Sequence, residues 1–338
     1  MKTSLRIYRF DTAKTILIVF VIVQHSFFSY FQVGHSRDLT EATRFLCLSF
    51  TMPMFACLSG WFMKRIPDKV VFLKQLFICI VFNFIGNILA KWAGYRSSWV
   101  PFVVSVSLWY LWVLTICRVV VPAMARAPGY VCIAFLASWS VCFLPERFGM
   151  RLPGRFFGFL PFFALGHFVA NGNVLSSVRK SLLNEVDKWW CFKYLLPLTM
   201  LYLAGFLFTA RGMDWQLVHD GLGHMTFGGG LVGVARKMLF QFLACLMGFL
   251  FLKCLPNHPN RLSELGRRTL PVYLYHIWFV LLGVKIVKHF GWMDATPQRY
   301  VVMFVVFMFC LLFFHPIFMY IIARLSDIPL VVFRRLHP

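Results

Sequence analysis

The chain has 338 residues, of which 60% are hydrophobic and 18% aromatic, and its formal net charge is +22. A soluble domain cannot bury that much apolar surface, so a polytopic helical membrane protein is the expected class. The Lys and Arg residues are spread over loops between apolar runs, a pattern that the positive-inside rule explains and that does not indicate a nucleic-acid-binding protein.

Ten apolar runs predict an all-α fold with about ten transmembrane helices. If the N-terminus is cytoplasmic, the inside segments hold 21 Lys and Arg residues and the outside segments hold 13, which favours an N-in, C-in topology. One membrane-embedded domain is expected to fill residues 1–338, with no cleavable signal peptide and no appended soluble domain. The expected spans are 12–31, 45–63, 70–90, 101–122, 129–144, 156–171, 193–210, 238–255, 270–290 and 300–323.

The first span carries ionisable residues along one face. His25 follows Lys14 by eleven residues, which is close to three helical turns and places His25 roughly 16 Å deeper along the helix. An ionisable residue at that depth is costly and is a candidate for a functional site. Imidazole also exchanges protons near neutral pH. A purely structural interpretation stays open, with Asp11 as a helix cap, Lys14 as an interfacial anchor and His25 in a helix–helix hydrogen bond.

The second and ninth spans contain further candidates. Ser59 and Gly60 allow close approach of another helix or of a ligand. Tyr273 and His276 are three residues apart and therefore neighbours on one helix face. The aromatic cluster 108–112 fits an interfacial belt, and His167 and His315 fit structural roles. The ten Cys residues lie mostly in apolar runs without ligand spacing, so no metal site is expected.

Taken together, these segments resemble acyltransferase family three, the membrane-bound O-acyltransferases of bacterial cell-surface glycans. The resemblance covers essentially the whole chain and is closest to the fucose 4-O-acetylase-like branch and the short surface-antigen acetylases. It implies that Lys14 and His25 match the family's basic residue and catalytic histidine, although many members have Arg in place of Lys. The segments that carry the resemblance are Asp11–Lys14 with His25, Met52–Phe55 with Ser59 and Gly60, Leu108–Leu111, Phe162–Gly166, and Leu265 and Gly266 with Tyr273 and His276.

The resemblance also implies an activity. Family members move an acyl group, usually acetyl from cytoplasmic acetyl-CoA, to a sugar hydroxyl of a surface polysaccharide or its lipid-linked precursor. The expected location is therefore the bacterial inner membrane, with the glycan acceptor, acetyl-CoA and membrane lipids as partners and no nucleic acid. His25 would act as general base, and Asp11 and Lys14 would orient polar groups. No metal or redox cofactor is implied.

The basic residues near the cytoplasmic face allow two interpretations. Lys64, Arg65, Arg267 and Arg268 are candidates for binding the phosphates of coenzyme A, and they equally satisfy the positive-inside rule without a ligand. Two alternatives to an acetyltransferase remain: a succinyl transferase acting on glucans, and a transporter of polysaccharide or lipid-linked sugar. The sequence shows no repeat symmetry of the kind common in transporters.

Overall fold

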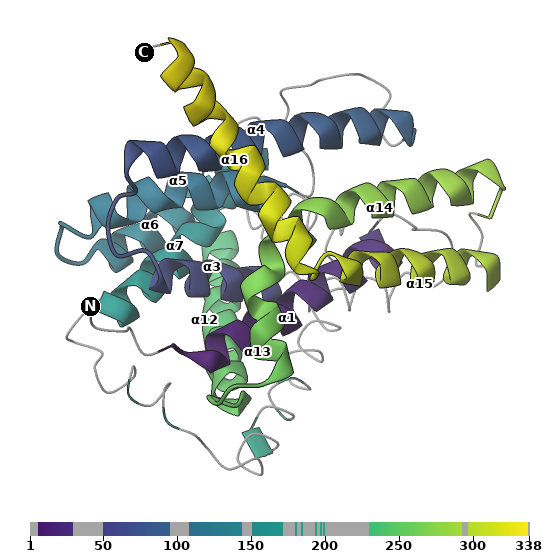
Figure 1. The fold of residues 1–338 in the computed structure, drawn as a ribbon. Helices are drawn as coiled ribbons and strands as arrows, with labels where there is room; N and C mark the ends of the chain where they lie inside the picture. The colour runs from purple at the N-terminus through teal and green to yellow at the C-terminus, as the bar shows by residue number, and fades with distance from the viewer. Residues whose placement is uncertain are drawn as a thin grey trace. The chain divides into compact units, whose positions relative to one another are not determined.

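The computed structural model describes residues 6–29, 50–94, 108–143, 151–171, 230–292 and 297–336, with a few isolated positions between 180 and 199. Over these ranges the chain forms helices and turns, and it contains no β-strand (Figure 1). The predicted all-α class is therefore confirmed. Most of the expected span 193–210 lies outside the described residues.

The helices begin and end close to the predicted spans over most of the described chain. In a membrane interior a backbone can satisfy its hydrogen bonds only within helices or closed barrels, and the apolar runs accordingly form helices. Their bounds are α1 (Tyr8–Val23), η1 (Gln24–Ser29), α3 (Met52–Trp61), α4 (Lys69–Trp92), α5 (Trp109–Met124), α6 (Tyr130–Ser140), η3 (Val141–Phe143), α7 (Arg151–Asn171), α12 (Gly230–Cys254), α13 (Arg261–Leu265), η5 (Gly266–Arg268), α14 (Thr269–His289), α15 (Pro297–Leu312) and α16 (Pro316–Leu336).

Three helical segments within the described residues are long and apolar enough to cross a membrane: α4, α12 and the continuous stretch Arg261–His289. The pair α15 and α16 is a fourth candidate if the two helices count as one span. Two shorter apolar helices, Trp109–Met124 and Tyr130–Phe143, accompany them. These helices support the prediction that the chain is a membrane protein. The count of ten spans and the N-in, C-in orientation stay predictions.

Two sequence-based boundaries were wrong. The expected span 300–323 is not one helix, because α15 and α16 meet at a bend of 67°. Pro316 is the first residue of α16, and a proline cannot donate the backbone hydrogen bond that would continue α15. The second error concerns α12, which begins at Gly230 instead of residue 238. Lys237, which lies outside the expected span 238–255, is therefore inside this helix and fully buried.

The chain forms two compact units. Unit 1 contains Met1–Lys14, Phe45–Ile66 and Ile116–Ser263, and unit 2 contains Thr15–Arg44, Pro67–Thr115 and Glu264–Pro338. The division between them falls within α1, α5 and α13.

Unit 1 is organised around the contact between α3 and α7, with α6 packed on α7 and α12 packed on α3 and α6. Glycines bring the two helix backbones together. A Cβ atom added to Gly60 would lie 2.0 Å from the carbonyl oxygen of Phe163, and one added to Gly166 would lie 1.9 Å from that of Cys57. The pair is therefore reciprocal, since each helix presents a glycine to the backbone of the other. Small residues at such crossings are typical of helices that associate in membranes.

Unit 2 is built around α14. This helix runs beside α15 in the opposite direction (Figure 1), and it also packs against α4, α16 and η1. Aromatic rings fill the contacts: Phe82 of α4 stacks on Trp278 of α14 with ring centroids 5.2 Å apart, and Tyr275 stacks on Phe313 at 5.0 Å. Lys74 of α4 forms an ion pair with Asp327 of α16 at 2.5 Å. The core of unit 2 thus surrounds the ninth predicted span.

Replacing Gly60 or Gly166 by Ala should destabilise unit 1, because the added methyl group would overlap a backbone carbonyl that cannot move independently of its helix. The expected cost is about 1–3 kcal/mol, the usual range for overpacking a core. Thermal unfolding of the purified protein in detergent measures the change. Gly248→Ala is the matched control, because its added Cβ would meet only the flexible side chain of Met54. Equal melting temperatures for all three variants would contradict the role of the glycine pair.

Candidate active site

Two histidines lie side by side in unit 2. The imidazole ring of His25 in η1 and that of His276 in α14 have centroids 5.3 Å apart and planes tilted by 32°. The two rings lie between packed helices, because η1 packs against both α14 and α15. The segment that carries His25 is a π-helix, a rare conformation that often marks functional sites. The sequence proposed both histidines as site residues, and the structure brings them together.

The hydrogen bonds of His276 define its tautomer. Its Nδ1 atom lies 2.8 Å from the carbonyl oxygen of Tyr273 and 3.1 Å from that of Val272. Carbonyl oxygens only accept, so Nδ1 carries the proton and donates it. The Nε2 atom of the neutral ring then has a free lone pair, and it has no hydrogen-bond partner among the residues that the structure describes. His276 is thus a fully buried acceptor next to His25.

Tyrosine rings border the histidine pair. The ring of Tyr273 lies 5.9 Å from that of His276 and 6.0 Å from that of Tyr110 at the start of α5. Tyr110 and the neighbouring Trp109 are buried, so this part of the cluster 108–112 packs inside unit 2 and does not form the exposed interfacial belt that the sequence suggested. The site therefore lies in an aromatic, water-poor environment, where electrostatic interactions are stronger than in water.

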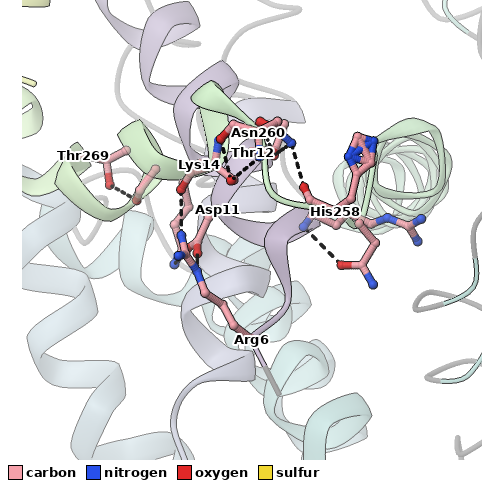
Figure 2. Close-up of polar contacts among 11 residues, drawn as sticks. Arg6, Asp11, Thr12, Lys14, His258, Asn260 and Thr269 are labelled. Atoms are coloured by element: carbon pink, nitrogen blue, oxygen red, sulfur yellow. Dashed lines mark hydrogen bonds and ion pairs between the residues drawn. The ribbon is translucent and has the colours of Figure 1, made fainter. Parts of the chain in front are cut away.

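A polar cluster surrounds the other end of the first predicted span, in unit 1. Asp11 lies between two cations: its carboxylate accepts from Nε of Arg6 at 2.9 Å and from Nζ of Lys14 at 3.2 Å (Figure 2). The ammonium group of Lys14 also lies 4.5 Å above the ring centroid of Phe62, the residue that follows α3. Asp11 and Lys14 are thus neighbours on α1, as their spacing predicts.

The segment between α12 and α13 fixes the start of α1. The amide Nδ2 of Asn260 donates to the buried hydroxyl of Thr12 at 3.1 Å, and its Oδ1 accepts the backbone N–H of Ser263 at 2.8 Å (Figure 2). Asn260 therefore caps α13 and holds α1 at the same time. Arg9 is buried and donates from Nε to the carbonyl of Leu255 at 2.7 Å. These bonds position the helix turn that carries Asp11 and Lys14.

A comparison with known protein families identifies the family of the chain. The family model described as the acyltransferase domain of family three matches residues 7–324. The chain belongs to this family. It is accordingly a membrane acyltransferase, which supports the enzyme hypothesis over the transporter hypothesis. No curated protein and no solved structure matches the chain.

The other site residues that the sequence predicts for the acyltransferase lie partly in unit 1 and partly in unit 2. Gly60 makes the helix contact with Phe163, and Ser59 precedes it on α3. Lys64 and Arg65 follow α3 and are exposed. In unit 2, Arg267 is exposed and Arg268 is half-buried at the start of α14, where its Nη1 lies 3.5 Å from the carbonyl oxygen of Phe314. The roles of these residues in donor binding stay predictions.

Four polar residues of unit 1 that bind other segments are not among the site residues predicted from the sequence, and three of them, Arg9, Lys237 and Gln241, are buried. Arg9 and Asn260 are the two that position α1. Lys237 donates from Nζ to the carbonyl oxygen of Ser138 at 2.6 Å, and Gln241 one turn later bonds the hydroxyl of the same serine at 3.0 Å. A helical-wheel search for polar residues within apolar segments finds Gln241, but no sequence signal marks the carbonyl groups that Arg9 and Lys237 bind.

Replacing Asn260 by Ala should destabilise the attachment of α1, because it removes a helix cap and leaves the buried hydroxyl of Thr12 without its amide donor. Caps of this kind contribute about 0.5–2 kcal/mol, so we expect a lower melting temperature in detergent. Asn260→Asp keeps the cap acceptor and should lose less stability. His258→Ala serves as control, since its side chain is exposed. An unchanged melting temperature for Asn260→Ala would show that the segment does not hold α1.

Proposed function

We propose that this acyltransferase is an O-acetyltransferase that moves acetyl from cytoplasmic acetyl-CoA to a sugar hydroxyl of a cell-surface polysaccharide or its lipid-linked precursor. The observation that carries the proposal is the contact between His25 and His276 within unit 2. Acyl transfer to an alcohol needs a group that removes the hydroxyl proton as the oxygen attacks, and a neutral imidazole suits that step near neutral pH. A bacterial inner membrane is the proposed location.

His25 is the proposed general base. The hydroxyl oxygen of the sugar attacks the thioester carbonyl carbon, and its proton passes to an imidazole nitrogen of His25. The tetrahedral intermediate then expels coenzyme A as a thiolate, which takes up the proton from the imidazolium, so the products are an ester and free coenzyme A. The neutral base is regenerated. A two-step route through an acetyl-histidine uses the same residue and balances in the same way.

His276 is proposed as the residue that orients the reacting groups. Its Nδ1–H is held by two backbone carbonyls, so the ring has a fixed orientation and only Nε2 is left to accept a hydrogen bond. Accepting a hydrogen bond from a ring N–H of His25 would fix the tautomer of the base. Accepting a hydrogen bond from the sugar hydroxyl would instead align the nucleophile. Tyr273 would border the reacting groups with its aromatic ring.

The cationic residues are proposed to bind the donor, and each unit has candidates of its own. Arg267 and Arg268 come directly before α14, the helix of His276, and guanidinium groups bind phosphate oxygens strongly. Lys64 and Arg65 offer exposed cations at the end of α3, next to the Ser59 and Gly60 that the family resemblance links to substrate. Asp11 and Lys14 are proposed to orient polar groups of the substrates. Succinyl-CoA is the alternative donor, and its second carboxylate would need one of these cations.

His25→Ala should abolish acylation while the protein still accumulates in the membrane. Loss of a general base typically lowers the rate about 10²–10⁴-fold. Mass spectrometry of the surface glycan from a deletion strain, complemented with wild type or variant, measures the modification. An acetyl-sized increment that returns only with wild type supports the proposal, and a succinyl-sized increment selects the alternative donor. Normal acylation by His25→Ala would remove His25 from the mechanism.

One substitution of His276, together with a control on the same helix, separates its packing role from its chemical role. Asn can place an amide N–H near the position of Nδ1 and keep a bond to the Tyr273 carbonyl, but it lacks the Nε2 acceptor. We therefore expect His276→Asn to fold and to lose roughly 10²-fold in activity, in the range for groups that assist proton transfer. His289→Ala, at the exposed end of the same helix, should retain wild-type activity. Wild-type acylation by a stable His276→Asn variant would limit His276 to packing.

A further inference from the structure

Unit 1 contains an apolar cavity that the proposed reaction does not use. Its volume is about 220 Å³, and it lies among residues of α1, α3, α7 and α12. Every lining residue is aliphatic, aromatic, glycine, proline, methionine or cysteine, so the lining contains no carboxylate, amide, hydroxyl or cationic side chain. The walls include Phe10, Met54, Trp61, Phe162, Cys245 and Phe249.

The size and lining of the cavity favour a hydrocarbon ligand over water. A buried water needs two to four polar partners, whereas an apolar cavity of about 150 Å³ stays dry and takes up benzene. This cavity is larger than that. An empty space of such volume in a core also costs stability, because its walls lose their dispersion contacts. A flexible alkyl chain would restore those contacts.

A lipid of the surrounding bilayer can supply such an alkyl chain. The cavity is partly open, and lining residues such as Cys57, Leu165 and Cys245 keep some accessible surface. One of its walls belongs to α12, a candidate membrane span whose outer face carries exposed Leu239 and Phe242. In a bilayer the neighbours of such a face are lipid chains.

Charge next to the cavity selects the kind of lipid. Phe10, which lines the cavity, lies 4.8 Å from Trp61 and 6.1 Å from Phe62 between ring centroids, and Lys14 lies over the ring of Phe62. Arg6 and Lys14 share the single carboxylate of Asp11, so these three side chains have a net positive charge. An alkyl chain in the cavity thus places its headgroup within reach of an excess cation, which favours a phosphate.

We propose that this cavity binds one acyl chain of an anionic phospholipid, whose phosphate pairs with Arg6 and Lys14. The inference goes beyond the proposed function, because it assigns a ligand other than the acetyl donor and the sugar acceptor, and Lys14 takes part in both. Such a lipid fills the space between α1, α3 and α12 and holds the start of α1 against the membrane surface. The site accordingly makes the stability of unit 1 depend on the lipid headgroup.

Photocrosslinking of the full chain in nanodiscs tests the proposal. The probe is a phosphatidylglycerol with a diazirine in one acyl chain, and adducts are mapped by peptide mass spectrometry. We expect adducts on the cavity walls of α3, α7 and α12, with weaker labelling from a neutral diacylglycerol probe. Adducts only on outward-facing residues such as Leu239 and Phe242 would overturn the proposal. Stronger wall labelling by a diazirine acyl-CoA than by the phospholipid would also overturn it, because the cavity would then belong to the donor.

A cavity-filling variant and a matched control at an exposed position test the site directly. Cys245→Trp places an indole in the cavity, and wall labelling by the phosphatidylglycerol probe should fall by roughly tenfold, the factor produced by a loss of about 1.4 kcal/mol. Cys132→Trp makes the same change at an exposed position of α6 and should leave wall labelling intact. Arg6→Gln should reduce labelling by phosphatidylglycerol but not by diacylglycerol. Unchanged labelling in both Cys245→Trp and Arg6→Gln would refute the site even if one variant folds poorly.

Discussion

The free-energy cost of burying polar groups in an apolar environment is the constraint on which this structure depends. An unpaired amide or hydroxyl in such surroundings costs about 1–3 kcal/mol by mutational measures, and an unpaired charge costs more. The described helices meet this constraint in a consistent way. Arg9 and Lys237 are buried and donate to backbone carbonyls, and Thr12 bonds the amide of Asn260. The polar side chains therefore connect helices that apolar packing alone would not position.

In unit 1 the same constraint acts together with close backbone contact. Gly60 and Gly166 allow α3 and α7 to approach until each glycine touches a carbonyl of the other helix. With that contact made, α12 completes the wall of an apolar cavity, and the cluster of Arg6, Asp11 and Lys14 lies beside it. A charged surface next to an apolar cavity matches the amphipathic chemistry of a phospholipid, which is why we assign that ligand class to the cavity.

In unit 2 backbone carbonyls fix the orientation and the tautomer of a candidate site residue, His276. Two carbonyls of α14 accept hydrogen bonds from the Nδ1–H of His276 and thereby leave Nε2 as an acceptor in a buried, aromatic environment. The π-helix of Gln24–Ser29 presents His25 to that ring. For a membrane acyltransferase, a fixed imidazole beside a second histidine is a suitable arrangement for controlling the proton of an attacking hydroxyl.

The sequence by itself determined the helical membrane class, the family, and the approximate limits of helices such as α4 and α14, because hydropathy and motif order are local properties of the chain. It also identified His25 and His276 as candidates, since ionisable residues stand out in apolar runs. Only the tertiary structure decided that these two rings touch, that α15 and α16 meet at a sharp bend, and that Lys237 is buried within α12. The ring contact and the burial of Lys237 depend on residues far apart in the chain or on backbone carbonyls that act as partners, and neither feature leaves a periodic signal in one sequence. Pro316 marks the end of α15 locally, but the angle between the two helices is a property of the folded chain.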